Sequence, residues 1–172
     1  MSEKNANRFV GKIVSAATEE VTLPNGFKMI LDRVRHPGGA AVVVVNEKRQ
    51  VCLLKHYRPI AGGWLWELPA GKLEPDESAM QTAQRELEEE TGVKATNWSE
   101  LGCIWSSPGV FDEKVHLYLA SDVTLGQHRR EADELMDMEW VDFEEALEWA
   151  MSNKIVDGKT VIGLFRAQAQ LI

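Results

Sequence analysis

The sequence is poor in the features that mark secreted, membrane-spanning or nucleic-acid-binding proteins. Its two cysteines, Cys52 and Cys103, are too few for a disulfide framework and lack metal-site spacing, so we expect buried or half-buried thiols of a cytoplasmic protein. The longest strongly apolar run, 40–45, is far shorter than the roughly 20 residues of a membrane helix. The N-terminal residues MSEKNANRFVG contain no apolar signal region. A net charge of −8 disfavours general binding to nucleic acid or anionic membranes.

Acidic residues are concentrated in two segments of an otherwise average composition for a globular domain of 172 residues. Residues 71–92 hold seven acids against Lys72 and Arg85, and residues 131–148 hold nine acids with no Lys or Arg. Two such segments invite a divalent cation. The alternative is a solvated acidic face, which we favour for the second segment taken alone.

The order of predicted elements indicates an α+β fold, a mixed α/β/α sandwich with a small N-terminal β segment. Two or three strands are predicted within 8–31 around the turn 24–26, and a hairpin is predicted from strands 40–45 and 50–56, the first of them buried on both faces. Further strands are predicted at 64–68, 98–105, 115–120 and 138–141. Helices are predicted at 78–91, 143–152 and 159–170.

The predicted helix 78–91 carries an acidic cluster. Glu86 lies three residues before Glu89 and four before Glu90, which places their side chains on neighbouring positions of one helix face. Like charges in this arrangement repel one another, and Mg²⁺ or Mn²⁺ would neutralise them, since hard cations prefer carboxylate oxygens. From the cluster alone, a solvent-facing acidic helix is an equally good interpretation.

The spacing around this cluster decides between the two interpretations. Residues 71–93, GKLEPDESAMQTAQRELEEETGV, resemble the Nudix box, G-x5-E-x7-R-E-U-x-E-E-x-G-U with U a bulky apolar residue. Every fixed position of the motif is matched, which makes a chance match very improbable. The resemblance implies a loop–helix–loop on an α/β/α sandwich, a divalent metal held by helix carboxylates, and hydrolysis of a nucleoside diphosphate linked to another group.

The resemblance also implies a role for each residue of the box. Glu86 and Glu90 correspond to the main metal ligands, together with the backbone carbonyl of Ala70, and Glu89 lies beside them. The other box residues have structural roles: backbone freedom at the two glycines, a pair that orients the loop, and apolar anchors to the sheet. They are Gly71 and Gly92, Glu77 and Arg85, and Leu87 and Val93.

Outside the box, the sequence resembles the branch of ADP-ribose pyrophosphatases and nucleoside-diphosphate-sugar hydrolases. The resembling segments are HYRPIAGGWLWELPAGKLE, SSPGVFDEKVHLYLA and the C-terminal EEALEWAMSNKIVDGKTVIGLF. Arg58 is the candidate for gripping a substrate phosphate, because a guanidinium binds phosphate oxygens in a bidentate way. Glu67 and Glu113 resemble branch positions near metal or ribose. Trp64 and Trp66 share one strand face and could stack on a base, although core packing is favoured for at least one.

The same resemblance implies a general base in a late acidic loop and a homodimer. Within the loop RREADEL we expect Glu134 to be the base, with Glu131 as its rival and Glu89 next. Residues 1–36 are expected to form an N-terminal β subdomain that is exchanged across the dimer, and residues 37–172 the catalytic domain.

We therefore predict a Mg²⁺-dependent (or Mn²⁺-dependent) hydrolase that splits the pyrophosphate of ADP-ribose or a related nucleotide sugar into a nucleoside monophosphate and a sugar phosphate. One alternative is a nucleoside triphosphate pyrophosphohydrolase of the same family, which the YRP and SPG elements disfavour. The other is a non-catalytic nucleotide-sugar sensor, which is disfavoured because no box glutamate is lost.

Overall fold

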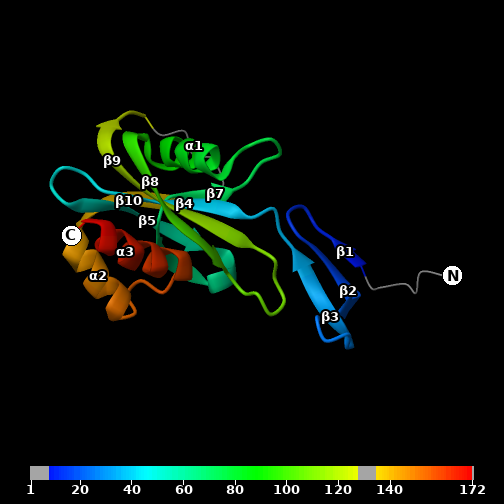
Figure 1. Ribbon diagram of the computed structural model, residues 1–172. Helices are drawn as coiled ribbons and strands as arrows, with labels where there is room; N and C mark the ends of the chain where they lie inside the picture. Colours follow the sequence, from blue (N-terminus) through cyan, green and yellow to red (C-terminus); the bar gives the residue numbers. More distant parts are fainter. Residues whose placement is uncertain (1–7, 128–134, 172) are drawn as a thin grey trace.

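The N-terminal strands form a sheet of their own that projects from the rest of the protein (Figure 1). The structure is a computed structural model that describes residues 8–127 and 135–171. Strand β2 (Ser15–Thr22) pairs antiparallel with both β1 (Arg8–Val10) and β3 (Lys28–Arg35). The predicted turn lies between β2 and β3, where Gly26 has a φ of 82° that favours glycine. All three strands lie before residue 36.

A four-stranded sheet in the order β7-β4-β9-β8 carries the segment before the acidic helix. Its strands are β4 (Gly39–Val44), β7 (Ala70–Lys72), β8 (Val93–Trp105) and β9 (Lys114–Leu125). The central strand β4 pairs parallel with β9 and antiparallel with the short β7. Strand β7 is therefore held at an edge of the sheet, directly beside β4.

A second, three-stranded sheet has the order β10-β5-β6 and is antiparallel throughout. It consists of β5 (Gln50–Arg58), β6 (Gly63–Glu67) and β10 (Met136–Asp142), and the 3₁₀ turn η1 (Pro59–Ala61) joins the first two. The register pairs Arg58 with Gly63 and Leu54 with Glu67. The end of β5 and the start of β6 therefore form an arm that ends in the η1 turn.

Helices cover both sides of these two sheets (Figure 1). Helix α1 (Ala79–Thr91) lies on one side, and α2 (Phe143–Met151) and α3 (Gly158–Leu171) lie on the other. Alternate residues of β4 enter two different apolar clusters, with Val42 packed on the α1 side and Val43 on the side of α2 and α3. The predicted sandwich is confirmed, as is the burial of 40–45 on both faces.

Two predictions about local structure are wrong. Strands β4 and β5 do not form a hairpin: apart from one bridge between Val45 and Val51, each is paired within a different sheet, because other strands take both of its edges. Cys52 is buried as expected, but Cys103 is exposed, since it lies on the edge strand β8 just after a register shift between Glu100 and Gly102. No helix in the described ranges is long and apolar enough to cross a membrane.

Candidate active site

The acidic helix α1 is defined at both ends by its own sequence. Ser78 caps the first turn by accepting a hydrogen bond from the Gln81 N–H, and the Gln81 side chain accepts from the Ser78 N–H in return. Gly92 ends the helix in the left-handed conformation, with φ of 73°. Leu87 and Val93 are buried against the sheet. The helix predicted at 78–91 is thus fixed in place by local signals and two apolar anchors.

Arg85 is the centre of the polar contacts on this helix. Its guanidinium donates to Glu77 at 2.8 and 3.1 Å, to Glu86 at 2.9 Å and to Glu89 at 3.0 Å. The hydrogen bond from Arg85 lowers the pKa of Glu77, and the same contact raises the pKa of Arg85. A fifth hydrogen bond, to the carbonyl of Lys72 at 3.3 Å, ties the guanidinium to the end of β7. One cation therefore offsets part of the repulsion among the carboxylates and connects them to the loop.

Glu86 lies directly against the backbone of β7 at Gly71. A Cβ atom at position 71 would stand 1.7 Å from Glu86 Oε1 and 2.0 Å from its Cδ, so only glycine leaves room for this carboxylate. The absence of a side chain at Gly71 therefore creates the space in which Glu86 sits. From the sequence we expected Gly71 to provide backbone freedom, but the structure gives it a steric role.

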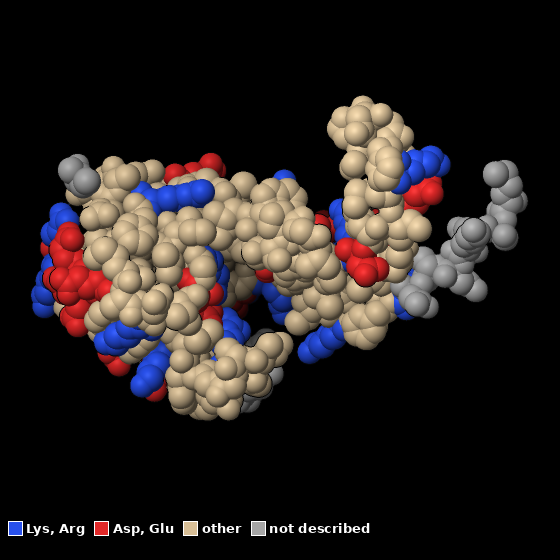
Figure 2. Space-filling model, turned by 90° about the horizontal axis from the view of Figure 1, so that it is seen from below, with Lys and Arg blue, Asp and Glu red and all other residues tan. Residues whose placement is uncertain are grey.

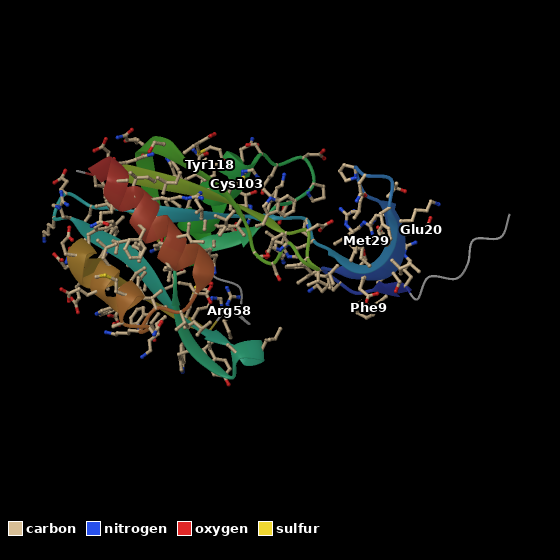
Figure 3. The ribbon with its side chains drawn as sticks, turned by 60° about the horizontal axis from the view of Figure 1, so that its bottom comes forward. Phe9, Glu20, Met29, Arg58, Cys103 and Tyr118 are labelled. Atoms are coloured by element: carbon tan, nitrogen blue, oxygen red, sulfur yellow. The ribbon has the colours of Figure 1, made fainter. Side chains whose placement is uncertain are left out.

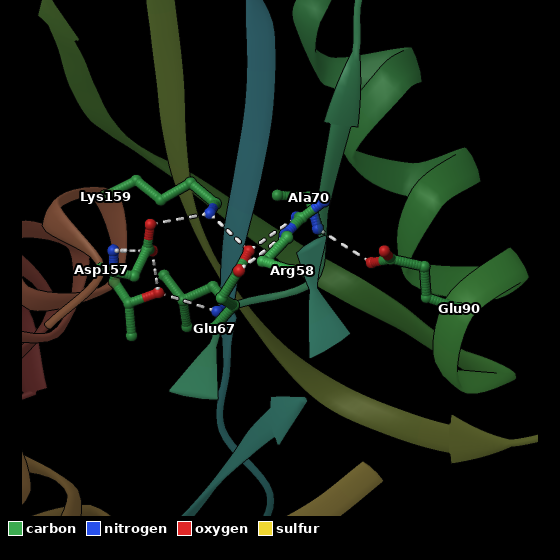
Figure 4. Close-up of polar contacts among 8 residues, drawn as sticks. Arg58, Glu67, Ala70, Glu90, Asp157 and Lys159 are labelled. Carbon is green, nitrogen blue, oxygen red and sulfur yellow. Dashed lines mark hydrogen bonds and ion pairs between the residues drawn. The ribbon is translucent and has the colours of Figure 1, made fainter. Parts of the chain in front are cut away.

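Glu90 is held one residue earlier along the same strand. Its Oε2 accepts a hydrogen bond from the Ala70 N–H at 2.9 Å, and the residue is buried. The carboxylates of Glu86 and Glu90 thus contact adjacent residues of β7, Gly71 and Ala70 (Figure 4 shows the Ala70–Glu90 contact). Glu89 faces solvent more, with its side chain 40% exposed.

The oxygen donors at this junction fit a hard divalent cation. Two carboxylates, Glu86 and Glu90, meet the strand that carries the Ala70 carbonyl, and the space beside Gly71 is occupied by a carboxylate rather than an apolar side chain. Within residues 8–127 and 135–171, no three His, Cys, Asp or Glu side chains are grouped to hold a metal by themselves. Two carboxylates and a carbonyl are the oxygen donors that suit an ion such as Mg²⁺, which usually keeps several water or substrate oxygens in its coordination shell.

Arg58 and Glu67, both predicted to bind substrate, bind each other. The Arg58 Nε and Nη2 donate to the two oxygens of Glu67 at 2.8 and 2.7 Å, a bidentate pair. Burial alone would raise the pKa of Glu67, but the hydrogen bond from Arg58 and the charge of Lys159 lower it to about 2. Arg58 remains 42% exposed at the end of β5, and Figure 3 shows it beside the start of α3.

Sequence reasoning missed two charged residues beside this pair. Lys159 Nζ donates to Glu67 Oε2 at 2.7 Å and to Asp157 Oδ1 at 3.0 Å. The signal was present in the C-terminal segment IVDGKTVIGLF, which carried a family resemblance but no residue assignment. The pKa of His56 is lowered by burial and by the charge of Arg58, and the charges of Glu67 and Lys159 also act on it.

The remaining predicted site residues lie elsewhere or outside the described ranges. The Glu113 carboxylate is 3.3 Å from Nδ1 of His36, and His36 lies in the loop that leads from β3 into β4. Trp66 packs against Trp149 and the apolar core, whereas Trp64 is 44% exposed and contacts Tyr57 edge-on. The two predicted general bases, Glu131 and Glu134, lie outside the described residues.

Comparison with known proteins identifies the family of the chain. The NUDIX domain model matches residues 35–159, which include the whole of β4 to α1. The chain belongs to the Nudix family. The recognition of this family from the sequence motif is thereby confirmed.

Two curated relatives and one solved structure resemble the chain over most of its length. It is 37% identical to the ADP-ribose pyrophosphatase of Bacillus subtilis (strain 168) over 158 residues, 91% of this chain and 85% of the relative. It is 36% identical to the methanol dehydrogenase activator of Bacillus methanolicus, covering 97% of this chain and 91% of the relative. A crystal structure of an ADP compounds hydrolase superposes with a TM-score of 0.81 at 19% identity, covering 98% and 92% of the two chains, which establishes the fold.

Proposed function

We propose that this Nudix protein hydrolyses the pyrophosphate bond of ADP-ribose or a related nucleoside diphosphate sugar, releasing a nucleoside monophosphate and a sugar phosphate. Its class as a Nudix pyrophosphohydrolase follows from the family match and from the ADP-ribose pyrophosphatase similar to it over most of both chains. The observation that carries the proposal is the complete Nudix box, whose Glu86 and Glu90 carboxylates meet β7 at Gly71 and Ala70.

Each group of the site has a role in this reaction. Glu86, Glu90 and the Ala70 carbonyl would hold Mg²⁺ or Mn²⁺, which lowers the pKa of a bound water and offsets the charge that develops on the phosphate. Arg58 would bind a phosphate oxygen of the substrate. The hydrogen bond with Glu67 raises the pKa of Arg58, and the charge of Glu90 on α1 adds to this rise. The guanidinium is charged and is available to a phosphate.

The proton of the attacking water requires a base. We retain Glu134 in this role, with Glu131 as its rival, because a carboxylate poised near such a water can accept a proton in the transition state. Glu89 is the next candidate: it lies on α1 beside Glu90, although its carboxylate is engaged with Arg85 at 3.0 Å.

A substrate panel tests the proposed activity. ADP-ribose, GDP-mannose, ADP-glucose and a nucleoside triphosphate would be incubated with the protein and Mg²⁺ or Mn²⁺, and the products identified by chromatography. We expect a nucleoside monophosphate and a sugar phosphate from at least one nucleotide sugar. Release of inorganic pyrophosphate from the triphosphate, with no cleavage of the sugars, would favour the triphosphate alternative. Binding of a nucleotide sugar without any cleavage would favour the sensor.

We also propose that the protein is a homodimer and that the β1–β3 sheet contacts the partner. This sheet and the turn between β2 and β3 carry large apolar side chains in contact with water, among them Ile30 on β3 at 71% and Phe27 in the turn at 63% exposure. Figure 2 shows the sheet as a lobe that projects from the main body, and Figure 3 shows Phe9 and Met29 upon it. Exposed apolar patches of this kind mark protein interfaces, and a second copy of the chain would cover them.

Light scattering at micromolar concentration tests the dimer. We expect twice the chain mass for the unaltered protein and a shift toward the monomer in a Phe27→Asp, Ile30→Asp variant. The control is Asp32→Asn, which lies on β3 like Ile30 and should leave the measured mass unchanged. A monomeric unaltered protein with full activity would contradict the proposal.

A further inference from the structure

We propose that Lys159, at the start of α3, is a positioning residue that holds Arg58 in place for the substrate diphosphate by fixing Glu67. The inference rests on the proposed function, since it requires that Arg58 binds the substrate. Its basis is a network of hydrogen bonds that links α3 to β5 and β6 (Figure 4).

The first part of the network anchors the lysine. Asp157 precedes α3, and its Oδ2 accepts hydrogen bonds from the Thr160 N–H at 3.0 Å and the Thr160 hydroxyl at 2.6 Å. This is the geometry of an N-cap, so the position of Asp157 is set by the helix. Its other oxygen, Oδ1, accepts a hydrogen bond from Lys159 Nζ at 3.0 Å. The ammonium group is therefore tied to the first turn of a helix that is packed against the core through Leu164 and Ala167.

The second part of the network fixes Glu67 from two directions. Lys159 Nζ donates to its carboxylate at 2.7 Å, and the N–H of the next residue, Leu68, donates to the buried Thr160 hydroxyl at 2.9 Å. The same helix turn thus holds both the side chain of Glu67 and the backbone that follows it. Glu67 itself is only 3% exposed, so its carboxylate has no solvent to replace a lost partner.

The third part of the network fixes the orientation of the Arg58 side chain. Glu67 accepts hydrogen bonds from Nε and Nη2 of the guanidinium, so the Nη1 atom is not part of this pair. Arg58 is 42% exposed, and an arginine so placed has many rotamers when nothing holds it. A fixed carboxylate beneath it selects one orientation, and selecting it before the substrate arrives strengthens binding because less entropy is lost.

The charges explain why a lysine is required in addition to the arginine. Glu67 Oε2 accepts from both Arg58 Nη2 and Lys159 Nζ, each at 2.7 Å, and Asp157 supplies the second negative charge. Two cations and two carboxylates therefore balance. Without Lys159, the two carboxylates would carry one negative charge more than Arg58 offsets, and Glu67 would lose one of the two cations that hold it in place.

A double-mutant cycle with Arg58 tests the inference. Lys159→Met keeps the aliphatic stem and removes the charge; we expect the KM for ADP-ribose, or for the nucleotide sugar that the panel ranks first, to rise roughly tenfold, with kcat changed by less than about threefold. Lys159→Arg should restore the KM to within about threefold, because it keeps the cation. Lys48→Met, at an exposed turn, is the matched control and should leave both constants unchanged.

The decisive measurement is Lys159→Met in an Arg58→Ala background. Because Lys159 acts through Arg58, its loss should then raise the KM by less than about twofold. An equal rise in both backgrounds, or no rise in the unaltered background, would overturn the inference while leaving the proposed function intact. If Arg58→Ala alone leaves the KM unchanged, the role of Arg58 in substrate binding is wrong, and the inference is wrong with it.

A second variant keeps the test decisive should Lys159→Met fail to fold. Asp157→Asn retains an acceptor for the Thr160 N–H and loses the charge that attracts Lys159. We expect a KM rise of about threefold that disappears in the Arg58→Ala background. A rise of the same size in both backgrounds, or no rise at all, would overturn the inference. Circular dichroism would establish that each variant is folded.

Discussion

Replacing Gly71 by alanine should damage the site while leaving the fold intact. The added Cβ would lie 1.7 Å from Glu86 Oε1, whereas ordinary contacts begin at 3.4 Å, so the carboxylate must retreat by about the same 1.7 Å. The backbone at Gly71 is not in the left-handed region, so alanine introduces no strain of its own. The three atoms nearest to the added Cβ all belong to Glu86, so the perturbation acts first on that side chain.

The substitution should have a small effect on stability and a large effect on catalysis. A forced rotamer of Glu86 costs about 0.5–1.5 kcal/mol, and weakening its hydrogen bond with Arg85 adds about 1 kcal/mol, because Arg85 keeps Glu77, Glu89 and the Lys72 carbonyl. We expect the free energy of unfolding to fall by about 1.5–2.5 kcal/mol. Displacing a ligand by more than 1 Å removes it from coordination distance, so kcat should fall on the order of 10²-fold.

The assay is a Mg²⁺ titration of ADP-ribose hydrolysis, combined with urea unfolding. Gly71→Ala should also raise the Mg²⁺ concentration for half-maximal activity by about tenfold or more. Gly158→Ala, where a Cβ would meet nothing within 4 Å, is the matched control and should leave the metal dependence unchanged. Unaltered kcat and metal dependence in Gly71→Ala would refute the placement of Glu86 at the metal site.

Three further predictions concern the carboxylates. Glu90→Gln should lower kcat by orders of magnitude with the fold retained, as checked by circular dichroism; near-normal turnover at saturating Mg²⁺ would contradict its role as a ligand. Glu134→Gln should reduce kcat by about 10²–10⁴-fold with little change in KM, and if Glu131→Gln does so instead, the base has been assigned to the wrong residue of the loop. Because the pKa of Glu67 falls from 4.5 to about 2 on folding, its pairs stabilise the protein above pH 4.5, and about 3 kcal/mol of stability is lost as pH falls toward 2. Measured by urea unfolding, the stability of Glu67→Gln should fall less steeply below pH 4.5 than that of the unaltered protein. Parallel plots of stability against pH for the two proteins would refute this.

The parts of the fold that depend on nearby residues were predictable from sequence. Helix α1 begins at Ala79 after its cap Ser78 and ends before Gly92, close to the predicted bounds 78–91, because caps are recognised within three or four residues. The burial of β4 on both faces follows from its unbroken apolar run.

The pairing of strands was not predictable from local pattern. The segment 40–45 followed by a turn and 50–56 reads as a hairpin, but β4 pairs with β9, whose first residue is Lys114. Nothing in the periodicity of either strand specifies that partner, since register and partner choice depend on long-range packing. Arg58 and Glu67 were identified separately for the same reason: their contact depends on the register of β5 with β6.

Electrostatics distinguish the two sides of the candidate site. On α1, one guanidinium, Arg85, contacts three carboxylates, those of Glu77, Glu86 and Glu89, and the buried Glu90 adds a fourth negative charge. On the α3 side, the two cations are balanced by two carboxylates. A diphosphate that enters between them therefore meets a net negative field from α1 and no net positive field to offset it. Since like charges at short range disfavour binding in a partly buried site, Arg58 alone cannot make the site attractive to the substrate. We therefore propose that a divalent cation offsets the excess of carboxylates on α1, and that the fixed orientation of Arg58 serves to place the diphosphate rather than to neutralise it.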